Sequence, residues 1–102
     1  MDQRTAIEIV KRYLAYLRDN KFDVQKAYLF GSYVNGRYHE DSDIDLAIIM
    51  SDFSNSFFTR IELMKMSRKF DIRIEPHPIE ASEFNATNPF ANEILSKGIR
   101  IY

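Results

Sequence analysis

The sequence predicts an α/β or α+β sandwich in which helices cover one small sheet. Two observations carry this prediction. Apolar residues recur at three- and four-residue steps in some segments and at alternate positions in others. These segments follow one another in the order helix, strand, turn, strand, helix, strand, helix, strand. Because the 102 residues contain no repeat, low-complexity tract or linker, we expect a single domain over residues 1–102.

The first half of the chain is predicted to hold one helix and two strands. The opening helix follows from helical spacing of its apolar residues, with Asp2 as its N-cap: Ala6, Ile9, Val10, Tyr13, Leu14 and Leu17. Residues 26–30 form a short strand that stops at a Gly-Ser pair. Residues 44–49 form the second strand, after a polar stretch over 31–42 that holds two of the three glycines.

The second half is predicted to hold two helices and two strands. A helix over residues 56–69 follows from the spacing of its apolar residues, with Phe57 and Phe58 used for packing. The third strand covers 70–75 and ends at two prolines, and a histidine between them, His77, is interpreted as a loop residue. The last helix begins at Asn88-Pro89 and ends at Gly98, and residues 99–102 form an edge strand.

Composition and charge exclude several classes of protein. The net charge of −1 argues against a protein that holds nucleic acid by bulk charge. The absence of cysteine removes disulfides, cysteine zinc sites and thiol nucleophiles together. No stretch approaches the roughly 18 apolar residues of a membrane span, and the N-terminus lacks the apolar run of a signal peptide. We therefore expect a soluble, cytoplasmic protein without a membrane partner.

Two features between residues 31 and 46 point to phosphate chemistry. The first strand ends in Gly31-Ser32, where a tight turn or helix start offers unpaired N–H groups and a small hydroxyl to an anion. About a dozen residues later, Asp43 and Asp45 lie two apart at the start of a strand and share one face. Two neighbouring carboxylates repel each other, a divalent cation relieves that repulsion, and their hard oxygens suit Mg²⁺. A phosphate cradle beside such a site is the minimum apparatus for phosphoryl or nucleotidyl transfer.

These residues resemble the signature of the DNA polymerase β-like nucleotidyltransferase superfamily. The matching positions are Gly31, Ser32, Gly36, Ser42, Asp43, Asp45 and Leu46. The short chain is similar to the minimal nucleotidyltransferase (MNT) branch, and the predicted element order extends the resemblance over nearly the whole chain. The resemblance implies a small mixed sheet covered by helices. It also implies that Gly31, Ser32, Gly36 and Ser42 bind the nucleotide.

The family uses a third carboxylate on a neighbouring strand, and two residues compete for that role. Asp71 is assigned by the match of residues 68–74 to the family's third-carboxylate strand, and Glu75 is the alternative. Both residues would lie on the same face of the predicted strand, so the alternation of side chains along a strand does not decide between them. A four-residue step along a strand is roughly 13 Å, so both cannot ligate one metal ion.

The resemblance also implies a reaction. A nucleoside triphosphate, ATP by resemblance alone, donates its nucleoside monophosphate to an acceptor hydroxyl and releases pyrophosphate. Asp43 and Asp45 ligate two Mg²⁺ ions, and Asp71 ligates the catalytic ion and accepts the acceptor's proton. Position 33, often basic in the MNT branch, is Tyr33 here. Either Arg37 or a residue of a partner replaces that charge, or the site binds the triphosphate weakly.

Three functions remain open at this point. MNT members pair with HEPN-domain toxins, so the first is AMP transfer to a protein partner of that kind, which suits a chain with room for little beyond a catalytic core. The second is a catalytically weak or inactive antitoxin that masks its partner by binding. The third is nucleotidylation of a small molecule, for which a dimer of this chain would have to complete the pocket.

Overall fold

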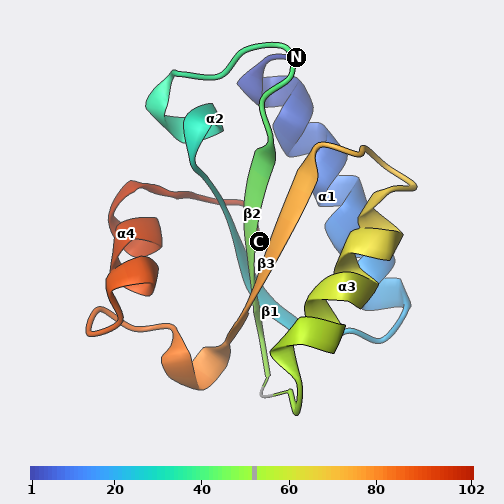
Figure 1. Cartoon of the computed structure of the whole chain (residues 1–102), viewed down its shortest axis with the longest axis vertical. Helices are drawn as coiled ribbons and strands as arrows, with labels where there is room; N and C mark the ends of the chain where they lie inside the picture. The colour runs from blue at the N-terminus through green and yellow to red at the C-terminus, as the bar shows by residue number, and fades with distance from the viewer. Residues whose placement is uncertain (52) are drawn as a thin grey trace.

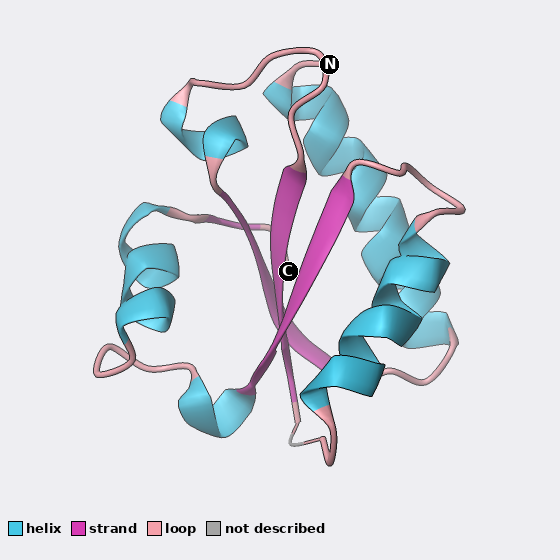
Figure 2. Cartoon of the chain, viewed as in Figure 1, coloured by secondary structure: helices cyan, strands magenta, loops and turns pink. Residues whose placement is uncertain are grey.

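The computed structural model describes residues 1–51 and 53–102 and contains one four-stranded sheet with helices on both faces (Figure 1). The helices and strands, in chain order, are α1 Gln3–Asp19, β1 Val24–Phe30, α2 Ser32–Asn35, β2 Ile44–Met50, α3 Ser56–Ser67, β3 Ile74–Glu80, the 3₁₀ helix η1 Ala81–Glu83, α4 Pro89–Lys97 and β4 Ile99–Arg100. Helices α1 and α3 cover one face of the sheet, and α4 lies on the other (Figure 2). The predicted fold class is confirmed.

The sheet is mixed, with strand order β3-β2-β1-β4. Strand β1 pairs antiparallel with β2 and with β4, and β2 pairs parallel with β3. The parallel pair is joined through α3, as a parallel connection requires a crossover. Six of the seven residues of β2 are buried, all except Asp45, because this strand has neighbours on both edges and helices above and below.

The main core lies between the sheet and the α1–α3 layer. Asp2 caps α1 as predicted, and its Oδ1 accepts from the backbone N of Thr5 at 2.8 Å. The buried stripe of α1 consists of Ala6, Val10, Tyr13, Leu14 and Leu17, and it meets alternate residues of β1 and β2. The hydroxyl of Tyr13 donates to the carbonyl of Leu63 in α3 at 2.8 Å, so one buried hydrogen bond joins the two helices.

The third strand differs from the prediction. It begins at Ile74, not at residue 70, and it continues through Pro76 and Pro78 to Glu80. Both prolines are tolerated because β3 is an edge strand. The carbonyl of Arg73 accepts from the N of Ile44 in β2 at 2.7 Å, so the backbone groups of odd-numbered residues in β3 point toward β2. The backbone nitrogens of the two prolines therefore point toward the free edge, where no hydrogen bond to β2 is lost.

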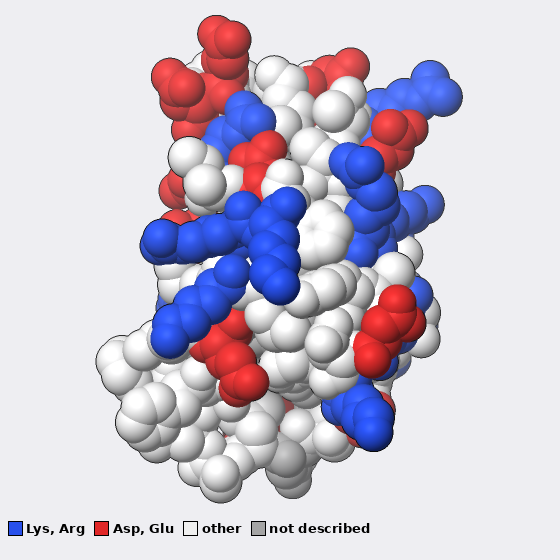
Figure 3. Space-filling view, turned by 90° about the vertical axis from the view of Figure 1, so that its right-hand side faces the viewer, with Lys and Arg blue, Asp and Glu red and all other residues white. Residues whose placement is uncertain are grey.

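Helix α3 shows a second difference from the prediction. Phe57 and Phe58 are each 67% exposed and are not core residues, whereas Leu63 and Ser67 point inward. Asn55 caps this helix by accepting from the N of Phe58 at 3.0 Å. Figure 3 views the side that carries α1 and α3: basic side chains gather across its middle, and an uncharged area occupies the end where α3 begins.

The second face of the sheet carries a smaller core. Tyr28, Ala47, Ile49 and Ile94 form it, with Phe84 packed against Tyr28. Asn88 caps α4 and Pro89 opens it, as predicted. Gly98 ends α4, where a Cβ would lie 2.6 Å from the carbonyl oxygen of Ile94, so the close approach of helix to strand needs glycine. Within the described residues no helix is long and apolar enough to cross a membrane.

Candidate active site

The Gly-Ser turn joins β1 to the four-residue helix α2. Gly31 has φ 75° and ψ −147°, a backbone conformation that is essentially restricted to glycine. A Cβ at this position would also overlap Oδ2 of Asp45. The turn and the aspartate are therefore packed against each other, and the missing side chain of Gly31 is what lets the carboxylate reach the turn.

Asp45 lies at the centre of the site. In the sheet register it stands between Phe30 of β1 and Glu75 of β3, and directly paired residues share a face. This is the face that carries α4. The Asp45 side chain is 28% exposed, and its Oδ1 lies 3.2 Å from Nε2 of His77. A half-buried carboxylate is thus held beside the Gly-Ser turn and remains open to solvent.

The residues that precede β2 have two different environments. Asp43 is exposed directly before the strand, on the side of Asp45 by strand alternation. Ser42 is buried, and its hydroxyl accepts from the N of His39 at 2.8 Å. This hydroxyl stabilises the loop before β2, and the contact of Ser42 with a nucleotide stays a prediction. Gly36 has φ 77° and ends α2 with open space around it.

The structure separates the two candidates for the third carboxylate. Glu75 is the register partner of Asp45, and adjacent strands lie about 4.8 Å apart. Its Oε2 is 3.6 Å from Nη2 of Arg60, a loose pair whose side chains are 33% and 46% exposed. Glu75 is therefore placed to share a cation with Asp45.

Asp71 lies outside β3, in the turn that precedes it, so its predicted place inside the strand is wrong. Its carboxylate accepts two hydrogen bonds from the guanidinium of Arg73, at 2.9 and 2.7 Å, and one from the backbone N of Arg73. The hydrogen bonds from Arg73 lower the pKa of Asp71 below its usual range. Arg73 also donates to the carbonyl of Glu40 at 2.9 Å, so Asp71 serves to fix this turn and the loop before β2.

His77 was interpreted as a loop residue, and this was wrong. It lies in β3 on the same face as Glu75, contacts Asp45, and packs between two aromatic rings, with centroids 5.1 Å from Phe30 and 6.1 Å from Phe90. The signal for it was present in the sequence: residues 75 and 77 share a strand face if the strand continues past the prolines. Only the edge position of β3, which the sequence does not reveal, makes that continuation possible.

Position 33 has no part in charge neutralisation. Tyr33 is fully buried, its ring stacks on Tyr38 at 4.7 Å, and burial raises the pKa of its hydroxyl. Arg37, the predicted substitute, does line a pocket with Gly31, together with Lys97 of α4. Glu93 lines the same pocket and pairs with Lys97 at 3.2 Å, so among the described residues Arg37 is the cation beside Gly31 that is not paired within this pocket.

The carboxylates fit a hard divalent cation by the chemistry of their donors. Asp43, Asp45 and Glu75 offer only oxygen donors, which suit Mg²⁺. Within residues 1–51 and 53–102, no three His, Asp or Glu side chains already surround a common point. Instead Asp45 turns toward His77 and Glu75 toward Arg60. To bind one cation together, the partly exposed side chains of Asp45 and Glu75 would have to rotate away from these partners.

Comparisons with known proteins show the family of this chain. The family model "Polymerase beta, Nucleotidyltransferase" matches residues 11–102. A stretch of 52 residues is 44% identical to the protein adenylyltransferase MntA of Shewanella oneidensis. This match covers 51% of the chain and 34% of that protein, about a third of the relative's length.

Solved structures resemble the chain over most of its length. A chain of a toxin–antitoxin complex with AMP-PNP has a TM-score of 0.66 at 26% identity, covering 94% of this chain and 72% of that one. A complex of tri-AMPylated Shewanella oneidensis HEPN toxin with MNT antitoxin gives a TM-score of 0.61 at 23% identity, covering 98% and 71%, and at that identity it shows the fold alone. With the family model matched from residue 11 to residue 102 and the Gly-Ser turn packed on Asp45, this chain belongs to the polymerase beta nucleotidyltransferase family.

Proposed function

We propose that this chain is a nucleotidyltransferase that moves a nucleoside monophosphate, AMP from ATP, onto a hydroxyl of a protein partner and releases pyrophosphate. The partner we propose is a HEPN-type toxin, neutralised by the modification. The observation that carries the proposal is the contact of the Gly31 turn with the Asp45 carboxylate, which puts a phosphate-binding turn beside cation ligands.

The relatives support the choice of nucleotide and acceptor. The Shewanella oneidensis relative is a protein adenylyltransferase, and structurally similar chains come from complexes with AMP-PNP and with a tri-AMPylated HEPN toxin. The chain covers only part of each relative, so substrate and partner are proposed for it by similarity.

Each residue of the site has a proposed task. Gly31 and Ser32 bind the phosphates with backbone N–H groups and a hydroxyl, and Arg37 adds the positive charge that Tyr33 cannot supply. Asp43, Asp45 and Glu75 would hold Mg²⁺, in two ions as in the family. Bound there, Mg²⁺ would neutralise charge on the transferring phosphate and its leaving group. We propose Glu75 for the third carboxylate, in place of Asp71, because it is the register partner of Asp45.

We also propose that Glu75 accepts the proton of the acceptor hydroxyl. It lies on the strand that borders the free edge of the sheet, on the side of Asp45 away from the Gly-Ser turn of β1. Its salt bridge with Arg60 is long and exposed, so a bound acceptor can replace it at small cost.

The alternative function is a binding module that masks its partner without modifying it. The exposed Phe57 and Phe58 favour it, because a large apolar surface suits a protein interface. A possible homo-oligomer would use the same kind of surface.

The two functions are separated by one experiment. The chain and its Asp45→Asn variant are incubated with α-labelled ATP, Mg²⁺ and a HEPN-type toxin from the same host. We expect label on the partner with the parent chain and a loss of at least a hundredfold with the variant, because the central carboxylate is gone. Folding of the variant is checked by circular dichroism. Unlabelled partner that is still neutralised by both forms would reject transfer and favour the binding module.

A further inference from the structure

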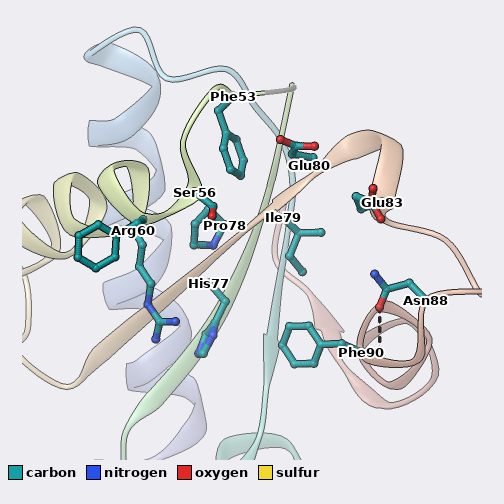
Figure 4. Close-up of a pocket in the computed structure, with 11 residues that line it drawn as sticks. Phe53, Ser56, Arg60, His77, Pro78, Ile79, Glu80, Glu83, Asn88 and Phe90 are labelled. Atoms are coloured by element: carbon teal, nitrogen blue, oxygen red, sulfur yellow. Dashed lines mark hydrogen bonds between the residues drawn. The ribbon is translucent and has the colours of Figure 1, made fainter.

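A groove runs along the free edge of β3, between the start of α3 and the η1–α4 segment (Figure 4). It encloses about 620 Å³. Its lining residues are Phe53, Ser56, Phe57, Arg60, His77, Pro78, Ile79, Glu80, Glu83, Asn88 and Phe90. The groove is thus built by segments from both faces of the sheet, brought together where the sheet ends.

One end of the groove is lined by the two side chains that pair with the carboxylates of the site. His77 lines the groove and contacts Asp45 at 3.2 Å, and Arg60 lines it and lies 3.6 Å from Glu75. Figure 4 shows the His77 and Arg60 side chains toward one end, away from Glu83. A molecule bound in the groove would therefore have a group next to the cation ligands.

Phe90 separates this groove from the pocket at the Gly-Ser turn, because its ring lines both. In a phosphoryl-type displacement the attacking and leaving oxygens lie roughly in line on opposite sides of the phosphorus. With the leaving phosphates at Gly31, the attacking hydroxyl has to arrive from the other side of Asp45. The groove along β3 is the opening on that side.

The walls of the groove indicate the chemistry of the occupant. Its middle is apolar, with three phenylalanines, a proline and an isoleucine. Its far end carries Glu80 and Glu83, and among the described residues neither forms an ion pair with Lys, Arg or His. Such a surface repels the phosphates of a nucleic acid and attracts a segment that has both apolar and basic side chains.

The backbone of the free edge limits how a segment can bind. Pro76 and Pro78 face outward at alternate positions, and neither has an N–H to donate. A peptide cannot add to this edge as a regular further strand, so recognition has to come from side chains.

We propose that the groove is the acceptor-docking site and that it binds a segment of the partner protein in which the modified hydroxyl is flanked by apolar and basic side chains. This inference rests on the proposed transferase function. In the bound state the hydroxyl lies at Glu75, the apolar side chains contact Phe53 and Phe57, and a Lys or Arg pairs with Glu80 or Glu83.

Two sets of short synthetic peptides test the proposal. Each contains Ser, Thr or Tyr beside leucines, with lysines in one set and glutamates at the same positions in the other. Binding to the full chain is measured by fluorescence polarisation, with Mg²⁺ and a non-hydrolysable ATP analogue present. Transfer of label from α-labelled ATP to the same peptides is measured in parallel.

The decisive variant is the double charge reversal Glu80→Lys with Glu83→Lys. We expect the parent chain to bind the lysine set at least tenfold more tightly than the glutamate set, and the variant to reverse that order. The matched control is Glu8→Lys with Asp19→Lys, which makes the same charge change at exposed positions of α1 on the other face of the sheet. Phe57→Ala, at a side chain that is 67% exposed, should weaken binding of both sets without unfolding the chain.

The outcomes distinguish this inference from the proposed function. Equal binding of the two sets, or an equal effect of the control variant, would overturn the groove assignment. Transfer that is abolished by Asp45→Asn but unchanged by the charge reversal would uphold the transferase and reject the groove. Selective binding without transfer to any bound peptide would reject the acceptor role. Transfer that follows the same lysine preference as binding would support both.

Discussion

At the residue scale, Gly31 meets two independent constraints. Its φ of 75° belongs to the conformations that favour glycine, and the Asp45 carboxylate occupies the space where a side chain would begin. Gly36 has nearly the same φ, 77°, but nothing lies within 4 Å of its Cβ position. Substitutions at the two positions therefore distinguish the effect of backbone strain, common to both, from the effect of steric overlap, which arises at Gly31 alone.

We expect Gly31→Ala to lose binding of an ATP analogue by at least tenfold, since the new methyl group displaces Asp45. Gly36→Ala adds only the backbone strain of a left-handed residue, about 1 kcal/mol, and should retain most of that binding. Isothermal titration of both variants checks this, with thermal unfolding as the measure of stability. Equal loss of binding in both variants would show that strain, and not displacement of Asp45, is responsible.

Asp71 and Glu75 are expected to respond in opposite ways to removal of their charge. Glu75→Gln should abolish transfer and leave stability nearly unchanged, because its one ion pair is long and exposed. Asp71→Asn should leave transfer largely intact and lower the free energy of unfolding at pH 7 by about 1–2 kcal/mol, because it loses charged hydrogen bonds with Arg73.

The stability difference at Asp71 should depend on pH. Its pKa is lowered in the fold, chiefly by the side-chain hydrogen bonds from Arg73, so its charge stabilises the fold above the unfolded pKa of about 3.9. That contribution is lost as the pH falls through the folded pKa. Urea unfolding of parent and Asp71→Asn at pH 7 and below pH 3 measures this. If the parent and Asp71→Asn differ as much in free energy of unfolding below pH 3 as at pH 7, the charge of Asp71 is not what stabilises the fold.

At the element scale, α1 and α3 are joined by a single buried hydrogen bond between side chain and backbone. Tyr13 donates to the carbonyl of Leu63, and both residues are fully buried. Burial also raises the pKa of Tyr13, which keeps the hydroxyl protonated as a donor. Apolar side chains of both helices also pack on the sheet in the main core.

Tyr13→Phe should lower the free energy of unfolding by about 1–2 kcal/mol, because the Leu63 carbonyl is left buried without this donor. The ring itself is retained, so packing against Phe70 should be unchanged. Urea unfolding measures the loss. As a control, Tyr16→Phe removes an exposed hydroxyl bonded to Lys69 and should cost less. An equal loss in the two variants would reject a special role for the buried bond.

The elements also show what could and could not be predicted from the sequence. Helix α1 follows from its apolar stripe and from Asp2, both of which are local signals. Strand β3 was placed too early because proline normally ends a strand, and only the sheet order shows that these prolines face a free edge. Helix spacing likewise groups Phe57 and Phe58 with the apolar residues, but it does not say which side of α3 meets the sheet.

At the scale of the whole molecule, the two faces of the sheet have different tasks. The α1–α3 face holds most of the core, whereas the α4 face leaves Asp45, Glu75 and His77 partly open. The Gly-Ser turn and the Asp pair could be predicted because their spacing is short and fixed along the chain. The positions of Asp71 and Glu75 relative to Asp45 could not, because they depend on the register of β3 against β2, set by the crossover through α3.

The stacked pair of Tyr33 and Tyr38 makes the Gly-Ser turn observable without a label. The chain has no tryptophan, so its near-ultraviolet circular dichroism comes from tyrosine and phenylalanine alone. Rings that lie 4.7 Å apart and 9° from parallel couple their electronic transitions strongly. Since Tyr33 is the second residue of α2 and its carbonyl accepts from Gln3 at 2.7 Å, movement of the turn would alter that coupling. The circular dichroism of these two tyrosines would thus report the binding of a nucleotide that we propose at this turn.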